Sequence, residues 1–482
     1  MIRFEHVNFS YDANPNEKIL SDVSLEIAGG ECVLFTGGSG CGKSTLLRLL
    51  NGLIPEFYEG TLSGRITVLG KDISQNGIYD LVGKIGTVFQ NPRAQFFNVD
   101  TTSELAFGCE NLAMPEAEIL ARIDMTVVDF HIEKLMNRDI FKLSGGEKQK
   151  IACASIDVLR PDIILLDEPA ANMDYESTSD LRQLIQIWKQ EGKTILIAEH
   201  RINYVWDIAD RVIILDRGMI TKNICKNEKN TFTDMMCQKY CLRSLSSVSV
   251  LDMVEKEKQG LSNKTKNMTE ANLVTNPKLE LTDFQYSYGN TEVICIGNMD
   301  ITENRITAVV GPNGTGKTTF LECLCGVRKN IGKLKFHGKD YDSKARLKEI
   351  FMVMQDPNHQ LFTESVLEEV LISMPDEDED KAREILKELD LSEFEERHPM
   401  SLSGGQKQRV ALACAIASER KILLLDEPTS GLDLTHMLEV ASILKKIKEQ
   451  GRTIIIVTHD SELIEVCCDE IVKLRETKNL AV

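Results

Sequence analysis

The sequence GGSGCGKS at Gly37–Ser44 returns in related form as GPNGTGKT at Gly311–Thr318. Each copy follows an apolar run that is typical of a strand, Glu31–Thr36 or Arg305–Val310, and precedes a segment with helical periodicity. A glycine-rich loop between a strand and a helix is the context in which this pattern binds phosphate groups. The chain is therefore predicted to contain two phosphate-binding loops.

Three further motifs follow each loop in the same order. They are LSGGE at Leu143–Glu147, ILLDEP at Ile164–Pro169 and His200 in the first half, and LSGGQ at Leu402–Gln406, LLLDEP at Leu423–Pro428 and His459 in the second. Positions 144 and 403, 167 and 426, and 200 and 459 all differ by 259 residues. This constant offset indicates a tandem repeat of one whole domain.

A length of 482 residues suits two domains of this kind better than one. We expect domains at residues 1–225 and 278–482, joined by residues 226–277. Within the joining segment, residues 246–277 are rich in Ser, Lys, Asn and Glu and read as a polar linker. Strands alternate with helices in both halves, which predicts an α/β fold with a mostly parallel sheet and helices on both of its faces.

Just before the linker, Phe232, Met235, Met236 and Tyr240 have the spacing of one helical face. This face fits either a docking helix for a partner or a terminal helix packed on the first domain. An apolar stripe at this spacing usually faces a core, which favours the second interpretation.

The composition is that of a globular protein, with 42% hydrophobic and 27% charged residues. No apolar run approaches the roughly 18 residues of a membrane span, and the N-terminus carries charges where a signal peptide is apolar. A net charge of −18 argues against a large nucleic-acid surface. The 13 cysteines include no CxxC pair, and Cys32, Cys153 and Cys414 lie in apolar segments, so we expect buried thiols and a reducing cytoplasm.

The glycine-rich loops point to a nucleoside triphosphate as ligand, because successive backbone N–H groups at a helix N-terminus match closely spaced phosphate charges. Lys43 and Lys317 are expected to reach the β and γ phosphates, and the hydroxyls of Ser44 and Thr318 to hold Mg²⁺. The residues assigned to nucleotide binding in the two loops are Gly37, Gly38, Ser39, Gly40, Cys41, Gly42, Lys43, Ser44 and Thr45, and Gly311, Pro312, Asn313, Gly314, Thr315, Gly316, Lys317, Thr318 and Thr319.

Carboxylates at the ends of two apolar strands are candidates for binding magnesium and for activating the attacking water. Asp167 and Asp426 are predicted to orient the magnesium ion, partly through water. The adjacent Glu168 and Glu427 are the candidate general bases for the attacking water.

His200 and His459 each follow the strand-end glutamate of their half by 32 residues. This equal spacing predicts that both histidines contact the γ-phosphate and the attacking water.

LSGGE and LSGGQ are specific to ATP-binding cassette (ABC) proteins, which the chain resembles over nearly its whole length outside the linker. The resemblance implies that each P-loop NTPase domain has a mostly parallel core sheet, a small antiparallel β subdomain and a helical signature subdomain. It also implies two composite sites, in which the signature of one half closes on the phosphate loop of the other. One site would join Lys43, Ser44, Gln90, Asp167, Glu168 and His200 to Ser403, Gly404 and Gly405. The other would join Lys317, Thr318, Gln355, Asp426, Glu427 and His459 to Ser144, Gly145 and Gly146.

The same resemblance assigns several further residues. Gln90 and Gln355 join the magnesium ligands, and Asp174 and Asp433 link the two sites. Tyr11 and Tyr288 match the position that stacks on adenine, although an ordinary strand aromatic in a small core is the alternative. The first half has Lys150 where Arg is usual, and AANMD in place of a form like SGLD, but neither change removes a catalytic group. Both sites are therefore expected to hydrolyse ATP.

The segments QNPRAQFF from Gln90 and QDPNHQLF from Gln355 resemble those of energy-coupling-factor importers and their cobalt-transport relatives. In that family a coupling helix of a membrane protein docks beside this glutamine. The candidate contacts are Gln95, Phe96, Gln360, Leu361 and Phe362, with packing inside the helical subdomain as the alternative for them.

The function that the resemblance implies is that of the ATPase subunit of an importer. The chain would lie at the cytoplasmic face of the membrane and use MgATP to drive uptake of a vitamin, a vitamin precursor or a metal ion. Its partners would be a transmembrane scaffold (T-type) subunit and a substrate-binding membrane (S-type) subunit, and its two halves would form an intramolecular ATPase pair. The main alternative is a tandem-cassette translation factor that acts on ribosomes. A DNA-repair ATPase is disfavoured because no coiled-coil or zinc insertion is visible.

Overall fold

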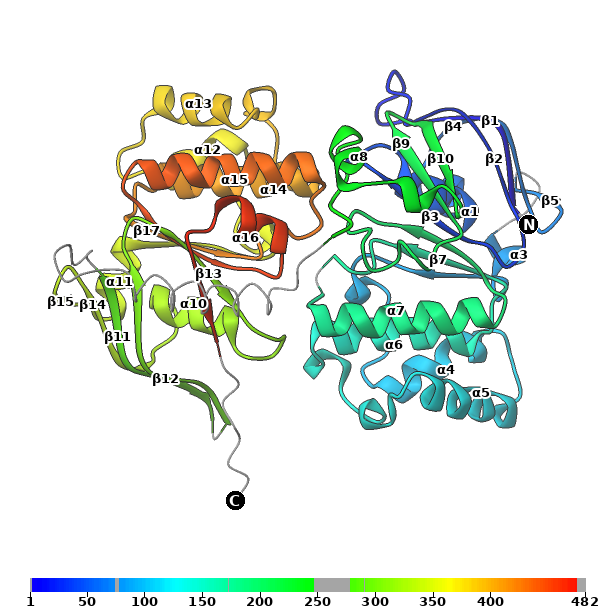
Figure 1. Cartoon of the computed structure of the whole chain (residues 1–482), viewed down its shortest axis with the longest axis horizontal. Coiled ribbons are helices and arrows are strands. Elements are labelled where there is room, and N and C mark those ends of the chain that lie inside the picture. The colour runs from blue at the N-terminus through cyan, green and yellow to red at the C-terminus, as the bar shows by residue number, and fades with distance from the viewer. Residues whose placement is uncertain (1, 74–77, 172, 247–277, 290, 475–482) are drawn as a thin grey trace. The chain divides into compact units, whose positions relative to one another are not determined.

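A computed structural model of the chain describes residues 2–73, 78–171, 173–246, 278–289 and 291–474 (Figure 1). These residues form two compact units, the first ending at residue 246 and the second containing nearly all of those from 278 onward. Of the predicted linker at 246–277, only residue 246 is among the described residues.

The first unit has a six-stranded sheet in the order β10-β9-β3-β8-β7-β6, and every neighbouring pair is parallel except β10 and β9. A separate antiparallel sheet has the order β2-β1-β4-β5. The strands are β1 Ile2–Tyr11, β2 Leu20–Ile27, β3 Cys32–Gly37, β4 Gly60–Val68, β5 Lys71–Asp72, β6 Ile85–Val88, β7 Ile163–Asp167, β8 Thr194–Ala198, β9 Arg211–Asp216 and β10 Met219–Cys225.

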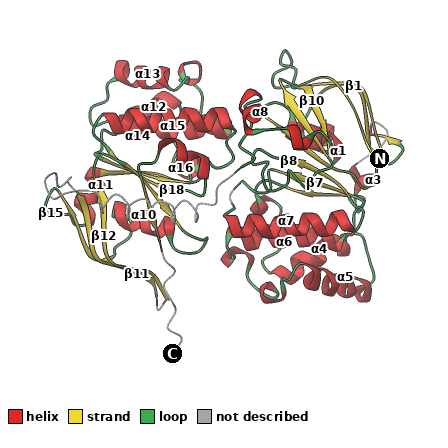
Figure 2. Ribbon diagram, in the orientation of Figure 1, coloured by secondary structure: helices red, strands yellow, loops and turns green. Residues whose placement is uncertain are grey.

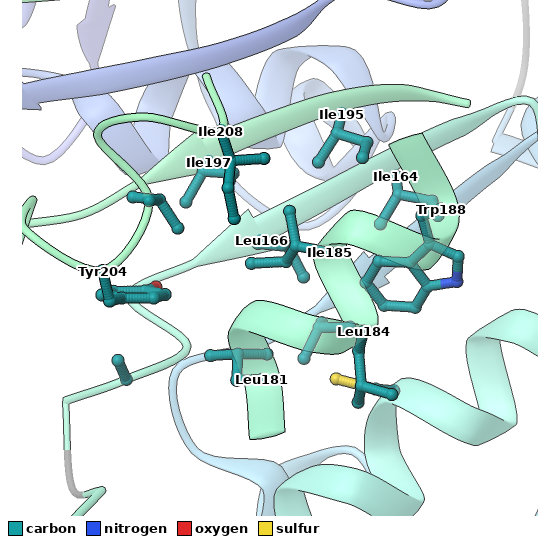
Figure 3. Packing of buried hydrophobic residues seen from close by; sticks show 14 of the residues in the cluster. Ile164, Leu166, Leu181, Leu184, Ile185, Trp188, Ile195, Ile197, Tyr204 and Ile208 are labelled. Atoms are coloured by element: carbon teal, nitrogen blue, oxygen red, sulfur yellow. The ribbon is translucent and has the colours of Figure 1, made fainter. Parts of the chain in front are cut away.

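Alternation along β3 divides the first unit between two apolar cores. Leu34 faces a core formed with helices α6 and α7, whereas Val33 and Phe35 face a core formed with α1 and the antiparallel sheet. Figure 3 shows Leu181, Leu184 and Trp188 of α7 packed beneath Ile164, Leu166, Ile195 and Ile197 of strands β7 and β8. The helices are α1 Lys43–Leu50, α2 Leu53–Glu56, α3 Ile78–Leu81, α4 Thr101–Asn111, α5 Glu116–Asp129, α6 Gly145–Val158, α7 Tyr175–Gln190 and α8 Asp234–Lys239.

The second unit repeats this architecture, with a parallel sheet in the order β16-β17-β18-β13-β19 and an antiparallel sheet in the order β12-β11-β14-β15 (Figure 2). Its strands are β11 Lys278–Tyr288, β12 Thr291–Thr302, β13 Ile306–Val310, β14 Ile331–Phe336, β15 Lys339–Asp340, β16 Ile350–Val353, β17 Ile422–Asp426, β18 Thr453–Val457 and β19 Glu470–Lys473. Its helices are α10 Lys317–Cys325, α11 Ser343–Glu349, α12 Val366–Leu371, α13 Glu379–Glu388, α14 Gly404–Ala417, α15 Leu434–Glu449 and α16 Ser461–Cys467. The predicted α/β fold with two tandem domains is confirmed.

Three helices pack against one another in each unit. Helices α4, α5 and α6 pack together in the first unit, and α12, α13 and α14 pack together in the second. The segments LSGGE and LSGGQ open α6 and α14. These groups match the helical subdomains that the sequence resemblance implies.

The helix expected near residue 236 packs on the first unit, and three of the four residues of the predicted face take part. Phe232, Met236 and Tyr240 contact the core that contains α7, and Phe232 lies 5.2 Å from the ring of Trp206. Met235 is 79% exposed, so its inclusion in the buried face was wrong. Cys237, which the predicted face did not include, is buried in α8.

All 13 cysteines are free thiols, and nine of them are buried. Burial raises the pKa of Cys32, Cys153 and Cys414 to about 12, which keeps these thiols protonated and unreactive. Among the described helices, none combines the length and the apolar character that a bilayer crossing requires.

Candidate active sites

The first glycine-rich loop joins β3 to α1 at the carboxyl end of the parallel sheet. Gly37 has a φ of 145°, and a Cβ added there would lie 2.1 Å from the carbonyl oxygen of Leu215 on β9. Gly42 caps α1 with a φ of 101°, a backbone conformation that favours glycine. Lys43 folds back over the loop, and its Nζ donates to the carbonyl oxygens of Gly37 (3.1 Å) and Gly38 (2.9 Å).

The second loop repeats this geometry between β13 and α10. Gly316 caps α10 with a φ of 82°, and the Nζ of Lys317 donates to the carbonyl oxygens of Gly311 and Pro312, each at 2.8 Å. Both lysines are buried and stay within the loop backbone. The predicted loop residues from Ser39 to Thr45 and from Asn313 to Thr319 lie in these loops and in the first turns of the helices that follow.

A hydroxyl and a carboxylate meet beside each loop. Ser44 Oγ donates to Asp167 Oδ1 at 2.7 Å, and Thr318 makes the corresponding hydrogen bond to Asp426. Burial raises the pKa of both aspartates, and the hydroxyl hydrogen bonds oppose that shift. Oxygen ligands of this kind fit a magnesium ion, which prefers carboxylates and hydroxyls over nitrogen or sulfur. Within the described part of the chain, no group of three or more His, Cys, Asp or Glu side chains suits a metal.

The two strand-end glutamates share an unusual backbone conformation. Glu168 follows β7 with a φ of 45°, and Glu427 follows β17 with a φ of 48°. Their N–H groups donate to the carbonyl oxygens of Ala198 (2.8 Å) and Val457 (2.9 Å) on the neighbouring strands. A left-handed conformation at a residue other than glycine costs free energy and tends to occur where it serves function.

In the first unit, two side chains hold the glutamate. Glu168 Oε1 lies 3.2 Å from His200 Nε2, and Gln90 Nε2 donates to Glu168 Oε2 at 2.8 Å. Burial acts to raise the pKa of Glu168, but His200 and the ammonium of Lys43 outweigh burial and leave the pKa below its ordinary value. The carboxylate therefore stays ionised at neutral pH.

In the second unit, the histidine is shared between two partners. His459 Nε2 lies 3.6 Å from Glu427 Oε1 and 3.1 Å from Asn313 Oδ1 of the glycine-rich loop. The N–H of His459 and the hydroxyl of Thr458 both donate to Glu427 Oε2 at 3.3 Å. Gln355, the counterpart of Gln90, is exposed beyond the end of β16.

The sequence interpretation missed one residue of the first site. Glu199 is 1% exposed, and its oxygens accept from the N–H groups of His200 (2.7 Å), Arg201 (3.1 Å) and Ala170 (3.3 Å). Burial and the nearby Glu168 raise its pKa. A glutamate directly after an apolar strand and directly before the histidine was the signal that could have identified it.

The signature serines cap the N-termini of long helices. Ser144 Oγ accepts from the N–H of Glu147 at 3.3 Å, and the Glu147 carboxylate accepts from the N–H of Ser144 at 2.8 Å. Ser403 and Gln406 form the same reciprocal pair on α14. Gly145, Gly146, Gly404 and Gly405 begin the two helices, so the helix N-termini are free of bulky side chains. The pairing of each signature with the loop of the other half stays a prediction.

The predicted adenine-stacking tyrosines have different surroundings. Tyr11 is half-buried, and its hydroxyl lies 3.0 Å from Thr45 Oγ1, while its ring meets Tyr58 edge-on at 6.4 Å. Tyr288 is 46% exposed, and the guanidinium of Arg328 lies 5.0 Å from the centre of its ring. Tyr11 is the last residue of β1, and Tyr288 is the last residue of β11.

The aspartates expected to link the sites both precede a long helix. Asp174 is buried and caps α7 by accepting from the N–H of Ser177 at 2.8 Å, and Asp433 is buried directly before α15. The unusual Lys150 forms an ion pair with Asp180 at 2.7 Å, and its counterpart Arg409 pairs with Glu439. The lysine therefore preserves the contact that arginine makes in the second half.

Most of the predicted partner-contact residues lie inside their units. Gln95 bonds the backbone of Phe89 and Ala152, and Gln360 bonds the backbone of Met354 and Met352. Phe96 and Leu361 pack in the helical subdomains, which supports core packing, the alternative that the sequence left open for them.

Two aromatic side chains of these segments are exposed, Phe362 at 72% and its counterpart Phe97 at 75%. The sequence interpretation named Phe362 but omitted Phe97. A buried glutamate supports each: Glu104 accepts from the N–H of Phe97 at 3.0 Å, and Glu369 accepts from that of Phe362 at 2.9 Å. The same hydrogen bond, from a backbone N–H to a buried glutamate, therefore fixes the main chain at both phenylalanines.

Comparison with known proteins identifies the family. The profile described as ABC transporter matches residues 20–171 and 296–430. A protein of Treponema denticola named as an ABC transporter ATP-binding protein is 42% identical over 98% of this chain and 95% of its own length. The protein of Bacillus subtilis named as the HMP/thiamine import ATP-binding protein YkoD is 31% identical over 99% of this chain and 90% of its own.

A solved structure shares the two-domain fold. Archaeal ABCE1, in a structure described as ribosome-bound with Pelota, superimposes with a TM-score of 0.64 and covers 94% of this chain and 74% of that one. At 20% identity this likeness shows the fold alone. The family match and the long relatives, taken with the paired loops, carboxylates and signatures, show that the chain belongs to the ABC transporter family of ATP-hydrolysing proteins.

Proposed function

We propose that the chain is the ATP-hydrolysing motor subunit of an importer of the energy-coupling-factor type, which drives uptake of a small nutrient through separate membrane subunits. The observation that carries the ATPase part is the strand-end glutamate, which both units hold in a left-handed conformation within reach of a histidine and a phosphate-binding loop. Two sites of this kind support hydrolysis in both halves.

The chemistry of each site is derived from the positions of its own side chains. Lys43 and Lys317 lie where the β and γ phosphates of ATP enter the loops, and their positive charge offsets the phosphate charge. Ser44 with Asp167, and Thr318 with Asp426, would hold Mg²⁺, with Gln90 and Gln355 as further ligands. When bound, the ion neutralises charge that develops on the phosphate oxygens.

Glu168 and Glu427 act as general bases. The lowered pKa of Glu168 keeps that carboxylate ionised at neutral pH, and each glutamate would accept a proton from the water that attacks the γ-phosphorus. His200 and His459 orient this carboxylate through their Nε2 atoms and contact the γ-phosphate from the neighbouring strand end. Adenine stacks on Tyr11 and Tyr288.

The two halves are proposed to form an intramolecular pair. Ser144, Gly145 and Gly146 would face the second phosphate-binding loop, and Ser403, Gly404 and Gly405 the first. Because α6 and α14 begin at these serines without bulky side chains, their N-terminal N–H groups suit a γ-phosphate. Bound ATP would then join the halves, and hydrolysis would release them.

The membrane partner is proposed to dock beside the segment that follows Gln90. An open pocket of about 220 Å³ lies beside Phe89, the residue directly before Gln90, and is lined mainly by apolar side chains. The lining residues are Asn51, Leu53, Ile78, Leu81, Val82, Ile85, Thr87 and Phe89. Together with exposed Phe97, this pocket suits the apolar face of a partner helix. The likeness to a relative named for HMP/thiamine import supports a small nutrient as the cargo.

Purification separates this proposal from the ribosomal alternative. We would isolate the tagged chain from membranes in mild detergent and identify the copurifying proteins by mass spectrometry. Two integral membrane proteins in comparable molar amounts are the expected result, and reconstitution of all three in liposomes should give ATP-dependent uptake. Ribosomal proteins in place of membrane subunits would overturn the importer assignment.

A further inference from the structure

A buried carboxylate accompanies the histidine in each unit, but it occupies different positions in the sequence. Glu199 comes directly before His200 and is 1% exposed, whereas Asp460 comes directly after His459 and is 5% exposed. Burying a carboxylate is costly unless hydrogen bonds compensate it. The contacts of these two acids therefore indicate what each is placed to hold.

In the first unit, the carboxylate ties two separate segments together. Glu199 Oε1 accepts from the N–H groups of His200 (2.7 Å) and Arg201 (3.1 Å), which form the turn after β8. Glu199 Oε2 accepts from the N–H of Ala170 at 3.3 Å and from the hydroxyl of Tyr204 at 3.1 Å. Ala170 belongs to the segment that follows the strand-end glutamate. The turn with the histidine is thereby fastened to that segment.

In the second unit, different atoms make the same connection. Asp460 Oδ2 accepts from Thr429 Oγ1 at 2.7 Å, and Thr429 lies two residues after Glu427. The N–H of Asp460 donates to Thr458 Oγ1 at 3.0 Å, and that hydroxyl donates to Glu427 Oε2 at 3.3 Å. The histidine turn is again fastened to the segment after the glutamate.

The offset of 259 residues shows that three positions differ together. Thr458 stands in the place of Glu199, Asp460 in the place of Arg201, and Thr429 in the place of Ala170. Alanine has no side-chain donor, so the first unit uses the backbone N–H of residue 170, whereas the second unit uses the Thr429 hydroxyl. The connection persists although every residue that makes it has changed.

We propose that Glu199 and Asp460 are positioning residues for ATP hydrolysis. Each carboxylate holds the histidine turn against the segment after the strand-end glutamate, so that His200 and His459 keep their contacts with Glu168 and Glu427. The proposal rests on the roles given to these four residues in the proposed function. It also explains how one half can place its carboxylate before the histidine and the other half after it.

Moving the carboxylate within the first unit tests this proposal in the full-length chain. The variant A170T/E199T introduces the two threonines of the second unit and removes the carboxylate. The variant A170T/E199T/R201D adds the carboxylate at the position that Asp460 occupies. The two variants differ only at residue 201, so each is the matched control of the other. A third variant, E199Q/D460N, alters both carboxylates with little change in shape.

For each variant we would measure kcat and KM for MgATP, the affinity for a fluorescent ATP analogue and the thermal midpoint. We expect A170T/E199T to lose at least half of the wild-type kcat, with KM and analogue affinity within threefold of wild type. Adding R201D should restore at least four-fifths of the kcat. E199Q/D460N should lose at least tenfold in kcat, again with binding retained.

Two outcomes would overturn the positioning role. One is an E199Q/D460N variant that keeps more than half of the wild-type kcat, and the other is an R201D addition that restores nothing. If E199Q/D460N does not fold, the pair that differs only at residue 201 decides the matter. The double variant E168Q/E427Q distinguishes the causes: if it abolishes turnover while the carboxylate variants do not alter it, only the positioning inference fails. If E168Q/E427Q is also without effect, the assignment of the sites themselves is wrong.

Discussion

Glu168 and His200 meet at 3.2 Å between Oε1 and Nε2, and they reach this contact from two neighbouring parallel strands. The glutamate adopts a left-handed backbone, and the histidine is 5% exposed. A general base needs a defined direction toward its water, and a buried partner on the adjacent strand supplies it. The counterpart pair, Glu427 and His459, lies 3.6 Å apart, so both units present the same arrangement.

Replacing both glutamates by glutamine should stop hydrolysis while preserving nucleotide binding. The amide of Glu168→Gln with Glu427→Gln keeps the hydrogen-bonding shape but cannot accept the proton of the attacking water. We expect kcat for MgATP to fall by about 10²–10⁴-fold, with the affinity for ATP retained. Release of phosphate and equilibrium binding of ATP measure the two effects. The exposed Glu388→Gln on α13 is the control, and undiminished turnover of the double variant would refute the assignment.

The pH dependence of turnover should reflect the lowered pKa of Glu168. Burial acts to raise this pKa, and His200 with Lys43 lowers it below the ordinary value of a glutamate. A base works when ionised, so its activity is present above the folded-state pKa and is lost as the pH falls through it. We therefore expect kcat to be level from about pH 7.5 down to about pH 5.5, since even an ordinary glutamate titrates near 4.3.

The variant His200→Gln removes the group that lowers this pKa, and it should shift the acid limb of the kcat profile toward higher pH. The measurement is kcat against pH, with each sample assayed again at pH 7.5 to exclude denaturation. A wild-type midpoint above pH 5.5 would contradict the role of Glu168 as the ionised base.

Much of the fold follows from local sequence. Strands β3 and β13 lie at Cys32–Gly37 and Ile306–Val310, within one residue of the predicted Glu31–Thr36 and Arg305–Val310. The glycine-rich loops also appear between the expected strands and helices, because glycine at positive φ is required there. Where the signal lies within one element, the sequence is sufficient.

The exceptions depend on contacts between distant residues. Phe96 is partly buried against the core and Phe97 is exposed, and Glu104 of α4 accepts from the backbone N–H of Phe97. Glu199 serves the first site through Ala170, which is 29 residues away in sequence. Met235 is exposed, whereas Phe232, Met236 and Tyr240 of the same predicted face pack on the core. None of these relationships is visible as a repeating pattern of apolar and polar residues in the sequence.

Alanine at two glycines of the first loop should separate steric conflict from backbone preference. A Cβ at Gly37 would lie 2.1 Å from the Leu215 carbonyl oxygen at a φ of 145°, whereas Gly40, with a φ of 73°, has no atom within 4 Å of its Cβ position. Gly37→Ala should destabilise the first unit by at least about 1–3 kcal/mol from backbone strain alone, with the clash in addition. Gly40→Ala should cost only about 1–2 kcal/mol. Thermal unfolding with and without ATP measures both, and an equal loss would contradict the geometry.

Two exposed phenylalanines should contribute to binding of the membrane subunits. Phe97 and Phe362 are 75% and 72% exposed, and each is held in place by a buried glutamate on the following helix. A backbone that is already fixed gives up little conformational entropy on binding, and large exposed aromatic side chains suit an interface. We expect Phe97→Ala with Phe362→Ala to reduce recovery of the membrane subunits in detergent at least tenfold, with the thermal midpoint retained. Leu120→Ala on α5, which removes another exposed apolar side chain, should leave recovery within twofold. Equal recovery with the double variant and the wild type would place the partner elsewhere.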